Sequence, residues 1–146
     1  MTDRISKLLF WLSWPIIYIM VRGTNRTRVL ILKDDSILLV SGWLNDGRWQ
    51  LPGGGVKRRE NFAKAALREM EEEVGIKTAL SNLKYLGERQ IKDNGLRYIC
   101  HYFLLKELGS INPKAGHEIK QFKFEKISKI NNNTHASEVI EGLKLI

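Results

Sequence analysis

The sequence is poor in cysteine and contains no low-complexity linker, internal repeat or second zone of composition. Its one cysteine, Cys100, excludes an intramolecular disulfide and fits a reducing compartment, so the cytoplasm is the expected location. Cys100 lies in the apolar run RYICHYFLL, and we expect a buried structural thiol there rather than a nucleophile. The absence of linkers and repeats predicts one domain over residues 23–146.

Acidic residues are also scarce, with 16 Asp and Glu against 24 Lys and Arg, which gives a formal net charge of +8. A basic chain favours polyanionic partners, such as nucleotides, nucleic acid or an anionic membrane surface. The sequence contains no recognisable nucleic-acid recognition module. Composition alone does not choose among these partners.

The N-terminus carries an apolar run, LLFWLSWPIIYIMV, over Leu8–Val21. As a helix this run spans about 21 Å, short of the roughly 30 Å of a bilayer's hydrocarbon core, and Pro15 is expected to kink it. Residues 1–22 are therefore predicted to form a docking helix without a catalytic group, whose removal leaves turnover nearly unchanged. Its partner is this domain, a second copy in a homodimer, or a membrane surface. A true span or a signal sequence is the remaining alternative.

Hydrophobic patterning predicts strands that bracket two helices. Gly75 is a natural stop for the first helix, which Asn61 caps at its start, and Asp93-Asn94-Gly95 is a strong hairpin signal. This order indicates an α/β fold with a mixed sheet between helices, preceded by the apolar N-terminal helix. The expected strands are 27–33, 36–42, 83–91, 96–108 and 118–127, and the expected helices are 61–74 and 136–146.

The first of these helices concentrates acid in a basic chain. Glu69, Glu72 and Glu73 share one helical face, whereas Glu71 points roughly opposite. Like charges at the C-terminal end of a helix are unfavourable, and a hard divalent cation would relieve that cost. The alternative is a solvated acidic face paired with Lys64 and Arg68 on the same helix.

The spacing around this helix is more specific than its charge. Glycine, five residues, glutamate, seven residues and then REMEEEVGI fill every fixed position of G-x5-E-x7-R-E-U-x-E-E-x-G-U, where U is apolar, from Gly54 to Ile76. On these residues the chain resembles the Nudix hydrolases. The preceding WQLPGGG and the strand order extend the resemblance from Thr27 to the C-terminus, and the N-terminal segment lies outside it.

The resemblance implies an α/β/α sandwich that hydrolyses a phosphoanhydride bond in a nucleoside diphosphate linked to another group, using Mg²⁺ or Mn²⁺. The chemistry requires neutralised phosphates and an activated water in line with the bond that breaks. The metal ligands implied by the family pattern are Glu69, Glu72, Glu73, Glu60 and the backbone carbonyl of Gly53. Gly54, Arg68 and Gly75 would have structural roles, with Arg68 holding the carboxylates in place.

The catalytic base is left open between a box glutamate, Glu69 or Glu72, and Glu118 in the later segment GHEIKQFKF. Glu88 and Glu107 are lesser alternatives, and His117 is interpreted as a plain loop histidine. The substrate-binding predictions are phosphate contacts from Arg28, Arg48 and Lys57, and base stacking on Trp43.

The leading prediction is a pyrophosphohydrolase acting on a small nucleotide, such as a nucleoside triphosphate or a nucleotide sugar. The alternative is a Nudix-fold binding or regulatory module without turnover. Such modules usually lack one or more box carboxylates, and this sequence lacks none.

Overall fold

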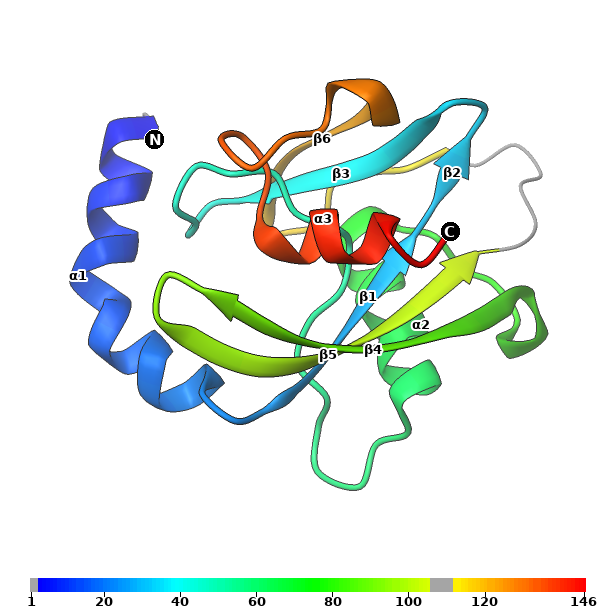
Figure 1. Ribbon diagram of the computed structural model, residues 1–146, viewed down its shortest axis with the longest axis horizontal. Helices are drawn as coiled ribbons and strands as arrows, with labels where there is room; N and C mark the ends of the chain where they lie inside the picture. Colours follow the sequence, from blue (N-terminus) through cyan, green and yellow to red (C-terminus); the bar gives the residue numbers. More distant parts are fainter. Residues whose placement is uncertain (1–2, 106–111) are drawn as a thin grey trace.

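Two small β-sheets lie between helices in the computed structural model, which describes residues 3–105 and 112–146 (Figure 1). Helix α2 packs behind β1 and helix α3 in front of it, while α1 lies apart at one side of the molecule (Figure 1). In chain order the elements are α1 (Asp3–Val21), β1 (Asn25–Leu30), β2 (Leu32–Lys33), β3 (Ser36–Gly42), α2 (Phe62–Val74), η1 (Leu80–Asn82), β4 (Leu83–Asp93), β5 (Leu96–Leu105), β6 (Ile119–Lys126), η2 (Ile127–Lys129) and α3 (Ser137–Leu143).

The predicted fold class is confirmed, and the strands divide into two three-stranded sheets. The sheet β1-β5-β4 is mixed, because β1 runs parallel to β5 and β5 runs antiparallel to β4. The sheet β2-β3-β6 is antiparallel. The expected strand 27–33 therefore becomes two, and Ile31 between them still accepts a hydrogen bond from the backbone of Leu38 at 2.9 Å.

Alternate residues of the central strands face opposite layers, as strand geometry requires. Val29 and Leu38 belong to the core under α2, whereas Leu30 and Leu39 belong to the core under α3. The second core also contains Cys100, where burial raises the pKa of the thiol to about 12. This environment agrees with the interpretation of Cys100 as a structural thiol.

Helix α2 has the predicted bounds, because both of its ends carry local signals. The side chain of Asn61 accepts hydrogen bonds from the backbone N–H groups of Ala63 at 2.9 Å and Lys64 at 3.4 Å. Gly75 ends the helix in the left-handed conformation with φ 67°, which favours glycine. Met70 and Val74 are fully buried beneath it. The two caps and the packing of α2 on the core together fix the direction in which its acidic face points.

Helix α1 has 19 residues, lies within the predicted range 1–22 and continues through Pro15. Ser6 of this helix is buried, and its hydroxyl donates to the backbone carbonyl of Trp43. By length and composition the window Arg4–Val21 could cross a membrane, and 6% of that window is buried. A helix of this kind near an N-terminus is weak support for a span.

Two further features concern the ends of elements, and one of them differs from the prediction. The hairpin between β4 and β5 turns at Asn94 and Gly95, with φ of 48° and 81°, as predicted. Helix α3 ends at Leu143 rather than at residue 146, since a turn in which Leu145 donates to Gly142 replaces its last residues.

Candidate active site

Arg68 gathers three carboxylates of the acidic motif around one guanidinium group. Its Nε and Nη2 donate to the two oxygens of Glu60 at 2.8 and 3.0 Å. Its Nη1 donates to Glu69 at 2.7 Å and to Glu72 at 3.1 Å. These bonds hold the pKa of Glu60 at about 2, well below its usual range. Arg68 thus contacts three of the predicted metal ligands, and its role in holding them in place stays a prediction.

Glu73 has a different environment from the other acids of α2. Its Oε2 accepts a hydrogen bond from the backbone N–H of Gly53 at 2.8 Å, and burial raises the pKa of its carboxyl to about 7. Glu71 points away and pairs with Lys77 at 2.9 Å. Glu69, Glu72 and Glu73 therefore belong to the site side of α2, and Glu71 to the solvent side, as helical spacing indicates.

The absence of a side chain at Gly54 makes room for the carboxylate of Glu69. A Cβ at Gly54 would lie 2.5 Å from Oε1 of Glu69, so the carboxylate occupies the space of the absent side chain. Within residues 3–105 and 112–146, no three or more His, Cys, Asp or Glu side chains are grouped so that they could hold a metal ion as they stand. The donor set nevertheless fits Mg²⁺ or Mn²⁺, because its donors are carboxylate oxygens and Glu73 is buried without full charge compensation.

Arg28 lies in the interior of the domain and connects the loop at Gly53 to the C-terminal helix α3. It is 4% exposed, and its Nε lies 2.6 Å from Oε1 of Glu138 on α3. Its Nη1 donates to the carbonyl of Gly53, the carbonyl predicted to bind metal. Glu138 also accepts a hydrogen bond from the hydroxyl of Tyr98 at 2.9 Å. Burial lowers the pKa of Arg28, but the nearby carboxylate of Glu138 raises it, and the net shift is upward. The guanidinium group therefore stays charged.

A cavity of about 520 Å³ opens beside Arg28, between α1 and the domain. One wall is apolar and comes from α1, with Phe10, Trp14 and Ile17. The opposite wall is mostly polar, although Leu44, Leu96 and Ala136 also belong to it. Its polar lining residues are Arg26, Arg28, Asp46, Arg48, Gln50, Asp93, Asn94, Tyr98, Glu118 and Glu138. The box carboxylates are not among the lining residues, and Arg28 connects the cavity to Gly53.

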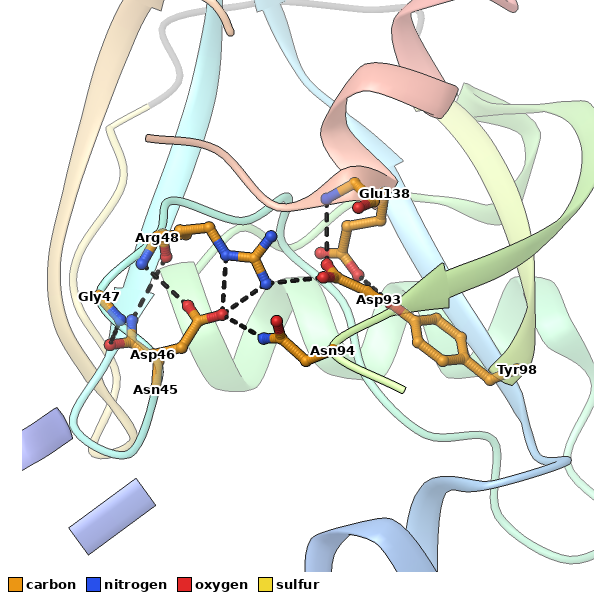
Figure 2. A network of polar contacts seen from close by, with 9 residues as sticks. Asn45, Asp46, Gly47, Arg48, Asp93, Asn94, Tyr98 and Glu138 are labelled. Atoms are coloured by element: carbon orange, nitrogen blue, oxygen red, sulfur yellow. Dashed lines mark hydrogen bonds and ion pairs between the residues drawn. The ribbon is translucent and has the colours of Figure 1, made fainter. Parts of the chain in front are cut away.

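Arg48, predicted to contact phosphate, is held at this cavity by two carboxylates. Its Nε donates to Asp46 at 2.7 Å and its Nη2 to Asp93 at 2.8 Å (Figure 2). Asn94 donates to Asp46 at 2.9 Å, so the network ties the loop before Arg48 to the hairpin of β4 and β5. Both carboxylates raise the pKa of Arg48 despite the lowering effect of burial. A phosphate would have to compete with these partners.

Glu118 lines the cavity and lies in an exposed turn just before β6. The same turn is tied to α2, because the backbone N–H of Gly116 donates to the carbonyl of Glu73 at 2.8 Å. His117 is exposed beside Glu118. The structure thus brings the predicted later glutamate to the cavity and its turn to the acidic helix.

The remaining predicted residues lie farther from the cavity lining. Trp43 is 40% exposed and is not a lining residue, although its neighbour Leu44 is. Lys57 is exposed, and its backbone N–H donates to Glu60 at 2.8 Å. Glu88 lies 3.6 Å from His101 on the exposed side of β4. Glu107 lies outside the described residues. The roles predicted for all of these residues stay predictions.

The sequence-based predictions did not include Arg26, Tyr98 and Glu138, which lie with Arg28 on the polar wall of the cavity. One signal for this wall was present in the sequence, since Arg26 and Arg28 occupy alternate positions of a strand and therefore share one face. A buried arginine requires an acidic partner. Burial lowers the pKa of Arg26. The partner, Glu138, lies on the last helix, and no spacing rule reaches that far along the chain.

A profile of the NUDIX domain family matches residues 23–143. The chain belongs to the Nudix hydrolase family, and the prediction of family and of an enzyme is confirmed. Helix α1 lies outside the matched residues.

Similar proteins include characterised enzymes and solved structures. The chain is 34% identical over 119 residues to human diphosphoinositol polyphosphate phosphohydrolase 3-beta, covering 77% of this chain and 71% of the relative. It is 34% identical over 121 residues to the rat diphosphoinositol polyphosphate phosphohydrolase 2, covering 77% and 65%.

Solved structures of lower identity share the fold. A MutT NUDIX hydrolase from Burkholderia pseudomallei has a TM-score of 0.74 at 22% identity, covering 86% of this chain and 98% of its own. A bifunctional NMN adenylyltransferase/ADP ribose pyrophosphatase from Francisella tularensis, solved with AMP and a Mn ion, has a TM-score of 0.72 at 20% identity, covering 98% and 47%.

Proposed function

We propose that this protein hydrolyses a phosphoanhydride bond in a nucleoside diphosphate linked to another group, with Mg²⁺ or Mn²⁺ as its cofactor. The observation that carries the proposal is the acidic face of α2. Glu69, Glu72 and Glu73 lie on one side of that helix, and Glu60 meets Glu69 and Glu72 at Arg68. A helix in a protein of net charge +8 has no structural need for this concentration of acid.

The metal, when bound, would neutralise phosphate charge and lower the pKa of a bound water. The chain's own residues do the positioning. Arg68 orients Glu60, Glu69 and Glu72, and Gly53 orients Glu73 through its backbone N–H. To bind a metal ion, these carboxylates would have to replace some of their hydrogen bonds to Arg68 with bonds to the metal. The presence of Mn with AMP in a structure of the same fold supports a divalent cation here.

Glu118 is the residue proposed to accept the proton of the attacking water. It is a carboxylate at the cavity, and its turn is hydrogen-bonded to α2 next to the box acids. Glu69 and Glu72 are the alternatives, because they stand at the site itself. A general base must come within hydrogen-bond reach of the water that it deprotonates.

The cavity supports a nucleotide more than a densely phosphorylated ring. Its lining contains three arginines, Arg26, Arg28 and Arg48, against four carboxylates, Asp46, Asp93, Glu118 and Glu138. Arg28 and Arg48 already have carboxylate partners. The aromatic rings of Phe10 and Trp14 on the other wall suit a planar base. The similarity to diphosphoinositol polyphosphate phosphohydrolases makes such compounds the second substrate class to test.

The experiment is a substrate panel with both products identified. Purified protein is assayed with Mg²⁺ and with Mn²⁺ against nucleoside triphosphates, nucleotide sugars, dinucleoside polyphosphates and diphosphoinositol polyphosphates. We expect cleavage of a nucleoside diphosphate conjugate, with loss of activity in Glu72→Gln and in the presence of EDTA. Failure to cleave any compound with either metal, together with retained nucleotide binding, would support the non-catalytic module instead.

A further inference from the structure

The outer face of α1 is apolar and continuous, and no described part of the domain covers it. Six large side chains on it are between 43% and 78% exposed. At about 100° per residue they fall within an arc of about 100°. These residues are Ile5, Leu8, Leu9, Leu12, Ile16 and Ile19. A soluble monomer rarely leaves a continuous apolar face of this kind in water.

The inner side of the same helix is already occupied by the domain. Ser6 is buried against the carbonyl of Trp43, and Trp14 and Ile17 line the cavity. Gly23, just after the helix, donates to the carbonyl of Arg97 at 2.8 Å. These contacts hold α1 along the side of the domain, so a membrane-crossing orientation would remove one wall of the cavity.

The charges around α1 indicate which surface covers its outer face. From Arg4 to Lys33 the chain contains no Asp or Glu. The basic residues in that range are Arg4, Lys7, Arg22, Arg26, Arg28 and Lys33. A second copy packed through α1 would bring like charges together at the ends of the helices, which is unfavourable. An anionic surface would instead gain from Arg4 and Arg22, which are exposed at the two ends of α1.

We propose that the outer face of α1 docks this protein, as a peripheral protein, on the surface of an anionic lipid bilayer. The helix lies in the plane of the surface with Leu12 and Ile16 in the acyl boundary and with Arg4 and Arg22 at the headgroups. The cavity walled by Trp14 on the opposite side of α1 then opens next to the bilayer. This placement does not depend on which substrate the site hydrolyses.

The test is flotation of the full chain with vesicles of phosphatidylcholine, with and without phosphatidylglycerol. We expect binding to the anionic vesicles that exceeds binding to the neutral ones by on the order of tenfold and falls at high salt. The double variant Leu12→Glu/Ile16→Glu should reduce binding by on the order of tenfold or more. Arg4→Gln/Arg22→Gln should weaken only the anionic-lipid component.

The matched control is Leu80→Glu, which adds the same charge at a leucine that is 50% exposed in η1, outside α1. It should bind vesicles as the wild-type chain does. Hydrolysis of a water-soluble substrate should be unchanged in the Leu12→Glu/Ile16→Glu variant, because neither residue lines the cavity.

Three results would overturn the proposal. The first is absence of flotation, or equal loss of it in Leu80→Glu. The second is a dimer in size-exclusion chromatography that becomes a monomer in Leu12→Glu/Ile16→Glu, which would mean that a second copy covers the face. The third is vesicle binding that resists high salt and is released only by detergent, which would mean that α1 spans the bilayer.

Discussion

Helices α1 and α2 differ in what fixes them. Helix α2 is capped at both ends by Asn61 and Gly75 and rests on the fully buried Met70 and Val74, with its acids outside. Helix α1 is apolar on both sides, lies outside the family match and has one side against a cavity. The difference shows that local signals and core packing fix the orientation of α2, whereas the position of α1 depends on the surfaces on either side of it.

The largest expected effect is the loss of activity when acids of α2 are substituted, and it distinguishes the site side of this helix from its solvent side. We expect Glu72→Gln and Glu73→Gln each to lower kcat by on the order of 10²-fold or more, because each removes a proposed metal ligand. Glu71→Gln, whose side chain pairs with Lys77, is the matched control and should stay near wild-type activity. Steady-state assays with saturating Mg²⁺ check this, and equal loss in all three variants would contradict the assignment of faces.

The second effect concerns stability without metal. The pKa of Glu73 is raised from an ordinary value of 4.5 to about 7, so the folded state binds this proton more tightly than the unfolded state. The free energy of unfolding should therefore fall as the pH rises from 4.5 through 7, with a contribution of about 1–3 kcal/mol from this group.

Glu73→Gln removes this titration and should stabilise the protein at pH 8 but not at pH 4.5. Urea unfolding in EDTA at the two pH values measures the change. Glu71→Gln should keep the wild-type dependence. A Glu73→Gln variant with no gain at pH 8 would show that the carboxylate has a compensating partner in solution.

The third prediction concerns the inner side of α1. Trp14→Ala should raise KM by about three- to tenfold with little change in kcat, because Trp14 is a wall of the cavity and not a charged group at the reaction. Trp11→Ala is the control, since Trp11 is 50% exposed and does not line the cavity. If the two variants behave alike, α1 acts only through its outer face. Removal of residues 1–22 should accordingly weaken substrate binding, while kcat stays nearly unchanged as the sequence predicts.

The smallest expected effect lies at the start of α2. Asn61→Ala should cost about 1 kcal/mol of stability, because the backbone N–H groups of Ala63 and Lys64 lose their acceptor. Asn132→Ala, in an exposed turn, should change stability by less than about 0.5 kcal/mol. Urea denaturation of both variants checks the difference, and equal costs would mean that the cap is not what fixes α2.

The features predicted from sequence are those that depend on local spacing. The bounds of α2 follow from Asn61, Gly75 and the apolar stripe between them, and the hairpin follows from Asn94-Gly95. The division of the first strand at Ile31 was not predictable, because it depends on which sheet each half joins. The contact of Arg28 with Glu138 and the cavity wall from α1 both join distant parts of the chain, and neither leaves a pattern of spacing in the sequence.

Because Gly54 has no side chain, a substitution at this position would displace the carboxylate of Glu69. A methyl group there would lie 2.5 Å from Oε1 of Glu69, and the flexible carboxylate, not the backbone, would have to move. Exchange for alanine would therefore leave the charge, the core and the caps of α2 intact. A search for inactive but well-folded variants has a natural starting point at this glycine, which controls the position of an acid by occupying no space.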